Sequence, residues 1–149
     1  MNGANRQDFD KWNEIKKLYN ELPAQKYPQF GEREVWFASL GKNIGYEQDG
    51  KGELFLRPVL IIKKFNKEAF LAVPLTSASE KKPFRISVGR IRGKDNSAII
   101  SQVRFVSAAR LRYRIGKLKT DEYEKIKDLV ANMISTRSAE EIETPSPQG

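Results

Sequence analysis

Hydrophobic residues near the N-terminus recur at intervals of three and four positions, which predicts an amphipathic helix over residues 8–22. Its apolar stripe consists of Phe9, Trp12, Ile15, Leu18, Tyr19 and Leu22. Asp8 is the expected N-cap, because its carboxylate can accept from free helix amides, and Pro23 is expected to end the helix. Residues 26–30 form a predicted linker.

From residue 32 onward the pattern changes to short apolar runs separated by polar or glycine-containing segments, which is typical of strands. The expected strands cover residues 35–38, 56–65, 69–75, 84–88, 97–100, 103–106 and 112–118. A hairpin turn at residues 66–68 joins two of these strands, and loops are predicted at residues 41–52 and 89–96. The latter loop is basic.

A second helix is predicted over residues 120–135, with Thr120 as its N-cap. Acidic residues follow at positions 121, 122 and 124, where they suit the positive end of the helix dipole. The apolar face of this helix consists of Tyr123, Ile126, Val130, Met133 and Ile134.

Short strands between two helices predict an α+β fold built around a small, strongly bent antiparallel sheet or barrel. A chain of 149 residues is long enough for one such domain with a real core. We expect an N-terminal amphipathic helix and linker in residues 1–30, the barrel with its C-terminal helix in residues 31–137, and a disordered acidic tail in residues 138–149.

The chain contains no histidine and no cysteine. This excludes disulfides, thiol nucleophiles and histidine-dependent acid–base chemistry, and it argues against zinc, copper and non-haem iron sites. We therefore expect no metal and no cofactor. The N-terminus is polar, unlike a signal peptide, and the longest apolar run, residues 59–62, is too short to cross a bilayer. A soluble cytoplasmic protein is predicted.

The net charge of +8 is concentrated in the middle of the chain, because residues 29–116 carry +9 while residues 1–28 carry +1 and residues 117–149 carry −2. Concentrated lysine and arginine most often bind a polyanion. A solubilising surface is the alternative.

Arg57 stands directly before Pro58 at the start of a predicted strand, which favours an extended backbone and a guanidinium held ready for a phosphate. Thr76 and Ser77 end the next strand, at the same end of the predicted hairpin as Arg57. These side chains could hold the non-bridging oxygens of a phosphate. The alternatives are an ion pair between Arg57 and Glu47, and ordinary capping by strand-end hydroxyls.

Two further polar side chains are candidates for contacts with a nucleic-acid base. Glu47, in the loop before the hairpin, could accept a proton or bond a base edge, and Gln102, near Arg104, could read a splayed base. In isolation, a solvated loop carboxylate and hydrogen bonding at a sheet edge explain these two residues more simply.

Six short segments occur in an order that resembles the PemK/MazF family of type II toxin–antitoxin endoribonuclease toxins. They are Gly31-Glu32-Arg33-Glu34-Val35-Trp36, Leu40 to Gln48, Arg57-Pro58-Val59-Leu60, Pro74-Leu75-Thr76-Ser77, Ser101-Gln102-Val103-Arg104 and Arg110-Leu111. The resemblance covers residues 31–135. It implies an SH3-like barrel of the PemK/CcdB type with a C-terminal helix, usually in a homodimer. The helix over residues 8–22 is additional to that pattern.

The resemblance also implies an activity. Family members cleave single-stranded RNA without a metal, often at a short preferred sequence, and a cognate antitoxin neutralises them. Intramolecular attack by the ribose hydroxyl would leave 2′,3′-cyclic phosphate and 5′-OH ends. Arg57 and Thr76 match the family's catalytic pair, and Glu47 is the candidate base. The expected RNA contacts are Gln48, Ser77, Gln102, Arg104, Lys42 and Asn43. The candidate base-stacking rings are Trp36, Tyr46 and Phe55, and of these Trp36 is favoured as a core residue instead.

Two other functions stay open at this point. One is a non-catalytic, CcdB-like module that poisons a target protein by binding it, and the other is an RNA-binding barrel that does not cleave. The presence of both Arg57 and Thr76 favours the nuclease. The loop at residues 49–56 is longer than in many family members, and the N-terminal helix could pack on the barrel or act as a lid over the RNA groove.

Overall fold

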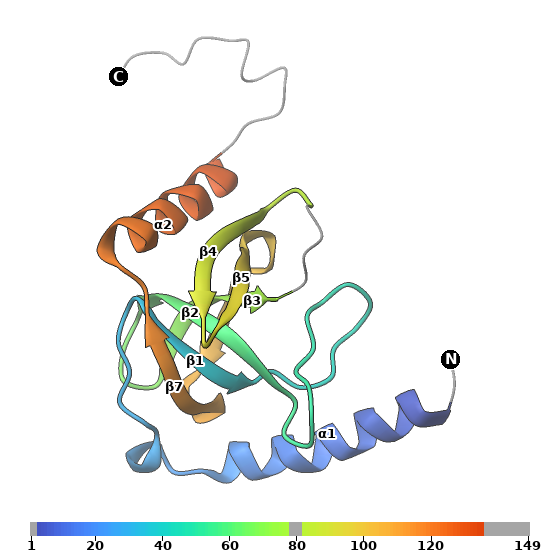
Figure 1. The fold of residues 1–149 in the computed structure, drawn as a ribbon. Coiled ribbons are helices and arrows are strands. Elements are labelled where there is room, and N and C mark those ends of the chain that lie inside the picture. Colours follow the sequence, from blue (N-terminus) through green and yellow to red (C-terminus); the bar gives the residue numbers. More distant parts are fainter. Residues whose placement is uncertain (1–2, 78–81, 136–149) are drawn as a thin grey trace.

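The computed structural model describes residues 3–77 and 82–135, which form an α+β fold of two α-helices and seven strands (Figure 1). The bounds are α1 Gly3–Glu21, β1 Glu34–Ser39, β2 Leu56–Lys64, β3 Ala69–Thr76, β4 Arg85–Ile91, β5 Lys94–Ile99, β6 Arg104–Ser107, β7 Leu111–Lys117 and α2 Thr120–Ser135. Three 3-10 turns lie between them: η1 Ala24–Lys26, η2 Ile100–Gln102 and η3 Ala108–Arg110. Neither described helix is long and apolar enough to cross a membrane.

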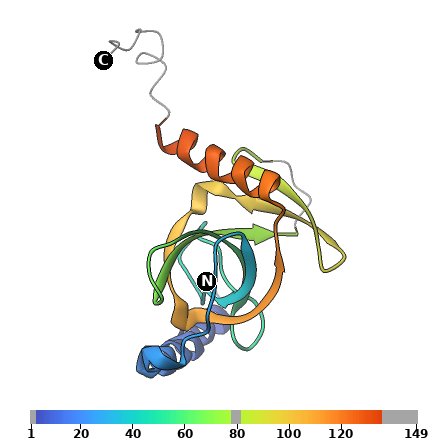
Figure 2. The same ribbon diagram turned by 90° about the vertical axis from the view of Figure 1, so that its left-hand side faces the viewer.

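The strands pair antiparallel in the order β4-β5-β3-β2-β1-β7, and β6 also pairs with β3. The sheet curls into the small barrel that the sequence predicted, and Figure 2 shows its ring of strands with α2 above it. In the β2–β3 hairpin Val59 lies opposite Pro74, so Arg57 and Thr76 lie at the same end. The turn predicted at residues 66–68 is confirmed, since the Phe65 amide donates to the Ala69 carbonyl at 3.1 Å.

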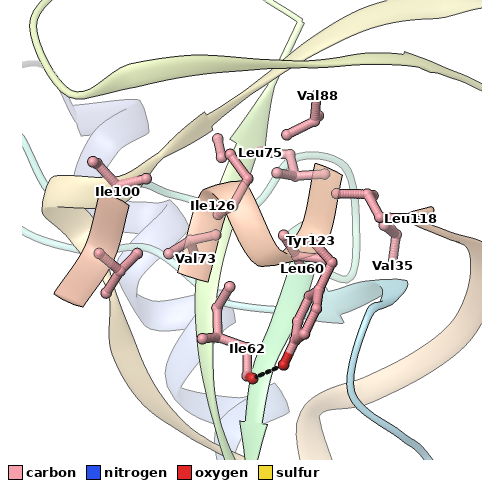
Figure 3. Close-up of a cluster of buried hydrophobic side chains, with 12 residues drawn as sticks. Val35, Leu60, Ile62, Val73, Leu75, Val88, Ile100, Leu118, Tyr123 and Ile126 are labelled. Carbon is pink, nitrogen blue, oxygen red and sulfur yellow. Dashed lines mark hydrogen bonds between the residues drawn. The ribbon is translucent and has the colours of Figure 1, made fainter. Parts of the chain in front are cut away.

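Alternate residues along β2 and β3 belong to two different buried clusters, because successive side chains point to opposite faces of a strand. One cluster lies under α2 and contains Leu60 and Val73 (Figure 3). The other contains Val59 and Ile61. Both faces of β2 are therefore buried, which explains the continuous apolar run at residues 59–62.

Helix α2 is anchored by Tyr123, whose hydroxyl donates to the Ile62 carbonyl at 2.5 Å (Figure 3). Burial and the nearby Glu32 and Glu124 carboxylates raise the pKa of Tyr123 to about 12, so the hydroxyl keeps its proton at neutral pH. The helix begins at Thr120, as predicted. However, the Tyr123 amide donates to the Lys119 carbonyl, so Lys119 rather than Thr120 takes the cap position.

Several predicted boundaries differ from the structure. Helix α1 already includes Gly3, so Asp8 lies inside the helix instead of capping it. The predicted loop at residues 89–96 is mostly strand, because β4 and β5 are joined by a tight turn at Arg92 and Gly93. Both turn residues have positive φ, of 53° and 77°, as a two-residue hairpin turn requires. The tail predicted for residues 138–149 lies outside the described residues.

Helix α1 packs on the barrel through Trp12, which is only 6% exposed. The Trp12 ring lies 5.6 Å from that of Phe55, and a Cβ built on Gly41 would lie 2.0 Å from Trp12 Cε2. The ring therefore rests on the backbone of the loop between β1 and β2. Leu18 was predicted in the same apolar stripe, but its side chain is 66% exposed. Packing was one of the two roles expected for this helix.

Replacing Trp12 by alanine should lower the free energy of unfolding by about 3–5 kcal/mol, because it removes a large buried side chain between α1 and the loop. Urea unfolding followed by circular dichroism measures this loss. Leu18→Ala is the matched control on the same helix and should change stability by no more than about 0.5 kcal/mol. Equal effects of the two substitutions would contradict the packing described.

Candidate active site

Arg57 is held at the start of β2 by two backbone carbonyls. Its Nε donates to the carbonyl of Asp49, and its Nη1 donates to the carbonyl of Leu75 at 3.1 Å. The other three N–H groups of the guanidinium make no hydrogen bond within residues 3–77 and 82–135. Two neutral acceptors thus fix the plane of the fork and leave donors available for an anion.

The charge of Arg57 is only partly compensated. Burial lowers the pKa of Arg57, the Asp49 carboxylate opposes that shift, and the positive charge of Arg85 adds to it. An arginine still remains protonated at neutral pH. A half-buried cation of this kind is stabilised when an oxyanion binds beside it.

Arg57 lines a cavity of about 720 Å³, which we name the Arg57 pocket. Thr76 and Ser77 also line it, and Thr76 ends β3 opposite Ser97 of β5. The described residues that line it are Phe37, Lys51, Gly52, Leu56, Arg57, Pro58, Leu75, Thr76, Ser77, Ile91, Arg92, Lys94, Asn96 and Ile115. These described residues include four cations and two hydroxyls but no carboxylate. Their chemistry suits a phosphodiester.

Glu47 does not join Arg57 and Thr76. It lines a neighbouring cavity of about 420 Å³, the Gln102 pocket, and its Oε1 accepts from the Ile44 amide at 3.0 Å. Arg57 therefore contacts the Asp49 backbone and not the Glu47 carboxylate that the sequence suggested as an ion-pair partner. The role of Glu47 as a base stays a prediction that this geometry does not favour.

The Gln102 pocket gathers most of the predicted RNA contacts in one place. Its lining is Leu40, Asn43, Tyr46, Glu47, Gln48, Pro74, Ser101, Gln102, Val103 and Arg104. Pro74 and Gln48 line this pocket, while their chain neighbours Leu75 and Asp49 bind Arg57, so the two pockets lie beside each other.

Within this pocket, several candidate side chains hold the loop between β1 and β2. Gln102 donates to the Tyr46 carbonyl at 2.8 Å and accepts from the Gln48 amide at 2.7 Å, so its amide spans two points of the loop. Asn43 donates to the carbonyls of Leu40 and Gln48. These amides shape the loop before any base can bind.

Two predicted cationic contacts lie in different settings. Lys42 Nζ pairs with Asp49 Oδ2 at 3.1 Å. Lys42 lines neither pocket described above but a third cavity on the α1 side of the loop, which shares Lys51 and Gly52 with the Arg57 pocket. Arg104 of β6 lines the Gln102 pocket; burial lowers its pKa, and the Glu47 carboxylate opposes that shift. Arg104 is therefore a half-buried cation next to the candidate base.

Sequence reasoning missed Asp49, which connects the loop to the site. Its carboxylate accepts from Lys42 and from the Asn43 amide, while its carbonyl accepts from Arg57. The only local signal was the Asp49-Gly50 dipeptide, which indicates a turn. Among the three candidate stacking rings, Tyr46 is 98% exposed, whereas Trp36 and Phe55 are both 7% exposed.

The barrel thus places a fixed arginine and a strand-end threonine in one basic pocket. Residues 32–134 match the family model described as PemK-like, MazF-like toxin of type II toxin–antitoxin system. Because this match covers most of the sequence, the chain belongs to that family. Helix α1 precedes the matched segment. Among curated proteins, none matches the chain.

Solved structures of the family share the fold. MazF (Form-I) from Deinococcus radiodurans superposes with a TM-score of 0.58 at 15% identity, over 74% of this chain and 98% of that chain. The Mycobacterium tuberculosis toxin MazF-mt6 gives 0.54 at 14% identity, over 71% and 100%. An endoribonuclease from a mycobacterial species gives 0.53 at 14% identity, over 76% and 96%. The likeness at this identity concerns the fold.

Proposed function

We propose that this protein is a toxin that cleaves single-stranded RNA at the Arg57 pocket, without a metal ion. The observation that carries the proposal is the Arg57 guanidinium, fixed by two carbonyls beside Thr76 in a pocket lined by cations and hydroxyls. Membership of the PemK/MazF family and likeness to a mycobacterial endoribonuclease support it.

In the proposed reaction the ribose 2′-OH attacks the adjacent phosphorus, a 2′,3′-cyclic phosphate forms, and the bond to the 5′ oxygen breaks. The 2′-OH loses its proton, and the leaving oxygen gains one. Arg57 stabilises the charge that develops on the non-bridging oxygens, and the Thr76 hydroxyl donates a further hydrogen bond. If Glu47 takes the proton, the loop that carries it must move, because its carboxylate faces the Gln102 pocket.

The Gln102 pocket is the proposed site for nucleotides next to the scissile phosphate. The exposed Tyr46 ring offers a stacking surface, and Gln48, Arg104 and Gln102 supply polar contacts around it. Bases can reach such a surface only when they are unpaired, which favours single-stranded RNA and a short preferred sequence. Ser77, which lines the Arg57 pocket, is a further proposed RNA contact, and Lys42 and Asn43 are proposed to contribute by shaping the loop.

The proposal also includes protein partners. An endoribonuclease from a mycobacterial species has been solved in complex with its cognate antitoxin, and that structure superposes with a TM-score of 0.51. We propose that this chain likewise binds a cognate antitoxin and acts as a homodimer in the cytoplasm, where mRNA is available. An acidic antitoxin would complement the +9 charge of residues 29–116.

Purified protein incubated with a long single-stranded RNA in EDTA should give discrete cuts. End mapping should find 2′,3′-cyclic phosphate on one side of each cut and a 5′-OH on the other. Intact RNA with salt-sensitive binding would support the RNA-binding barrel instead. Intact RNA with no binding would leave the CcdB-like, protein-binding alternative.

A further inference from the structure

A second basic groove lies between α1 and the end of β6 with the following turn η3, and it shares no lining residue with the Arg57 pocket. This α1 groove has a volume of about 370 Å³ and is lined by three cations, Lys16, Lys17 and Arg110, and by the aromatic rings of Trp12 and Tyr19. No described carboxylate lines it. Like the Arg57 pocket, it therefore offers positive charge with no carboxylate among its described lining residues.

This positive charge does not come from a generally basic helix. Residues 3–21 contain four cations and four carboxylates, so α1 as a whole is neutral. The other flank of α1 lines a cavity of mixed charge that includes Asp8 and Glu14. The groove is thus lined by two cations of α1, Lys16 and Lys17, and by no described carboxylate, whereas Lys11 lines the other cavity together with Asp8 and Glu14. Lys17 pairs with Glu14 at 3.0 Å, but both side chains are mainly exposed and the pair is weak.

The α1 groove adjoins the Gln102 pocket. Strand β6 begins at Arg104, which lines the Gln102 pocket, and ends at Ser107, which lines the α1 groove. Three residue steps in a strand cover about 10 Å. Arg110 also connects the two sites. It lines the α1 groove, and its Nη1 donates to the carbonyl of Leu40, which lines the Gln102 pocket.

We infer that the α1 groove is a second binding site for single-stranded RNA, which holds phosphates of the same strand beyond the nucleotides in the Gln102 pocket. This inference rests on the proposed function for the identity of the ligand. Lys16 and Lys17 bind the backbone electrostatically. Arg110 adds a half-buried cation whose bonds to described residues come from Nη1 alone, so that its Nε and Nη2 can face a phosphate. Because α1 precedes the segment matched by the family, the site is an addition to the family barrel.

The test compares Lys16→Ala/Lys17→Ala with wild type in equilibrium binding to 2′-O-methyl single-stranded RNA, which lacks the attacking hydroxyl. Oligonucleotides of about 4 and about 16 nucleotides span the site sizes that small barrels cover. A control variant, Lys119→Ala/Lys125→Ala, removes two exposed lysines at α2, on the opposite side of the barrel from α1 (Figure 1). Both variants lose the same net charge.

Wild type should bind the longer RNA more tightly than the shorter one. Lys16→Ala/Lys17→Ala should bind the longer RNA roughly tenfold more weakly than wild type, and the slope of its log affinity against log salt concentration should be smaller in magnitude by about 1.4. The control variant should keep both. Equal affinities of the two variants for the longer RNA would overturn the inference. So would equal losses of affinity for the short and the long RNA, because the α1 groove should contact only the longer strand. Cleavage of unmodified RNA by wild type is scored separately, so a protein that binds through α1 but does not cut refutes the proposed function alone.

Discussion

Replacing Arg57 by alanine is expected to lower the rate of RNA cleavage about a hundred- to a thousandfold. A preorganised donor at the developing oxyanion typically contributes this much, and Arg57 is such a donor because two backbone carbonyls fix its guanidinium. The barrel should stay folded, since the side chain is only half-buried and lies at one end of the sheet. Single-turnover cleavage of a defined RNA, together with thermal unfolding, measures both effects.

Arg57→Lys tests whether the shape of the guanidinium matters in addition to its charge. Lysine keeps the positive charge but cannot bond the Asp49 and Leu75 carbonyls and still present a planar fork, so its rate should stay close to that of the alanine variant. Arg90→Ala is the matched control, because Arg90 is exposed, pairs with Asp95 at 3.5 Å and does not line the Arg57 pocket. Cleavage by Arg57→Ala within a few-fold of wild type would exclude Arg57 from the chemistry.

The proximity of Arg57 and Thr76 could be predicted from the sequence because it depends on local structure. Two apolar strands joined by the turn at residues 66–68 fix their own register, and the turn therefore decides which residues share an end. The fold class followed from the same kind of evidence, a succession of short strands between two amphipathic helices.

The positions of Glu47 and Gln102 could not be predicted in this way. The bonds that join Gln102 to the loop connect residues more than 50 positions apart, and they depend on how the loop closes. A loop has neither a periodic hydrophobic pattern nor a paired strand, so its sequence does not show which distant residues it contacts. The partner of Trp12 was hidden for the same reason: the helical period identified a buried face but not the Gly41 backbone that it covers.

Loop 49–56 shows why a glycine inside a loop can matter as much as a catalytic side chain. A Cβ built on Gly50 would lie 1.5 Å from the carbonyl oxygen of Phe55, which is a backbone atom and cannot rotate away. Around this close approach, Lys51 and Leu56 exchange two backbone hydrogen bonds, at 2.7 and 2.8 Å. The Asp49 carbonyl that holds Arg57 comes directly before Gly50. The closed loop therefore depends on glycine at this position.

Gly50→Ala should open the loop and lower the free energy of unfolding by about 1–3 kcal/mol, as expected for an added methyl group without space. It should also lower the cleavage rate up to about a hundredfold, because a misplacement of about 1 Å at a reacting group has an effect of that size. Urea unfolding and single-turnover cleavage, measured on the same preparation, give the two numbers.

Gly116→Ala is the control for Gly50→Ala, since its added Cβ would meet nothing within 4 Å. It should change stability by no more than about 0.5 kcal/mol and leave cleavage intact. A Gly50→Ala protein that is destabilised yet cleaves at the wild-type rate would show that the Asp49 carbonyl does not position Arg57. The opposite result is loss of cleavage in Gly50→Ala and in Arg57→Ala but not in Gly116→Ala. That result would show that the closed loop positions the Arg57 guanidinium for catalysis through the Asp49 carbonyl.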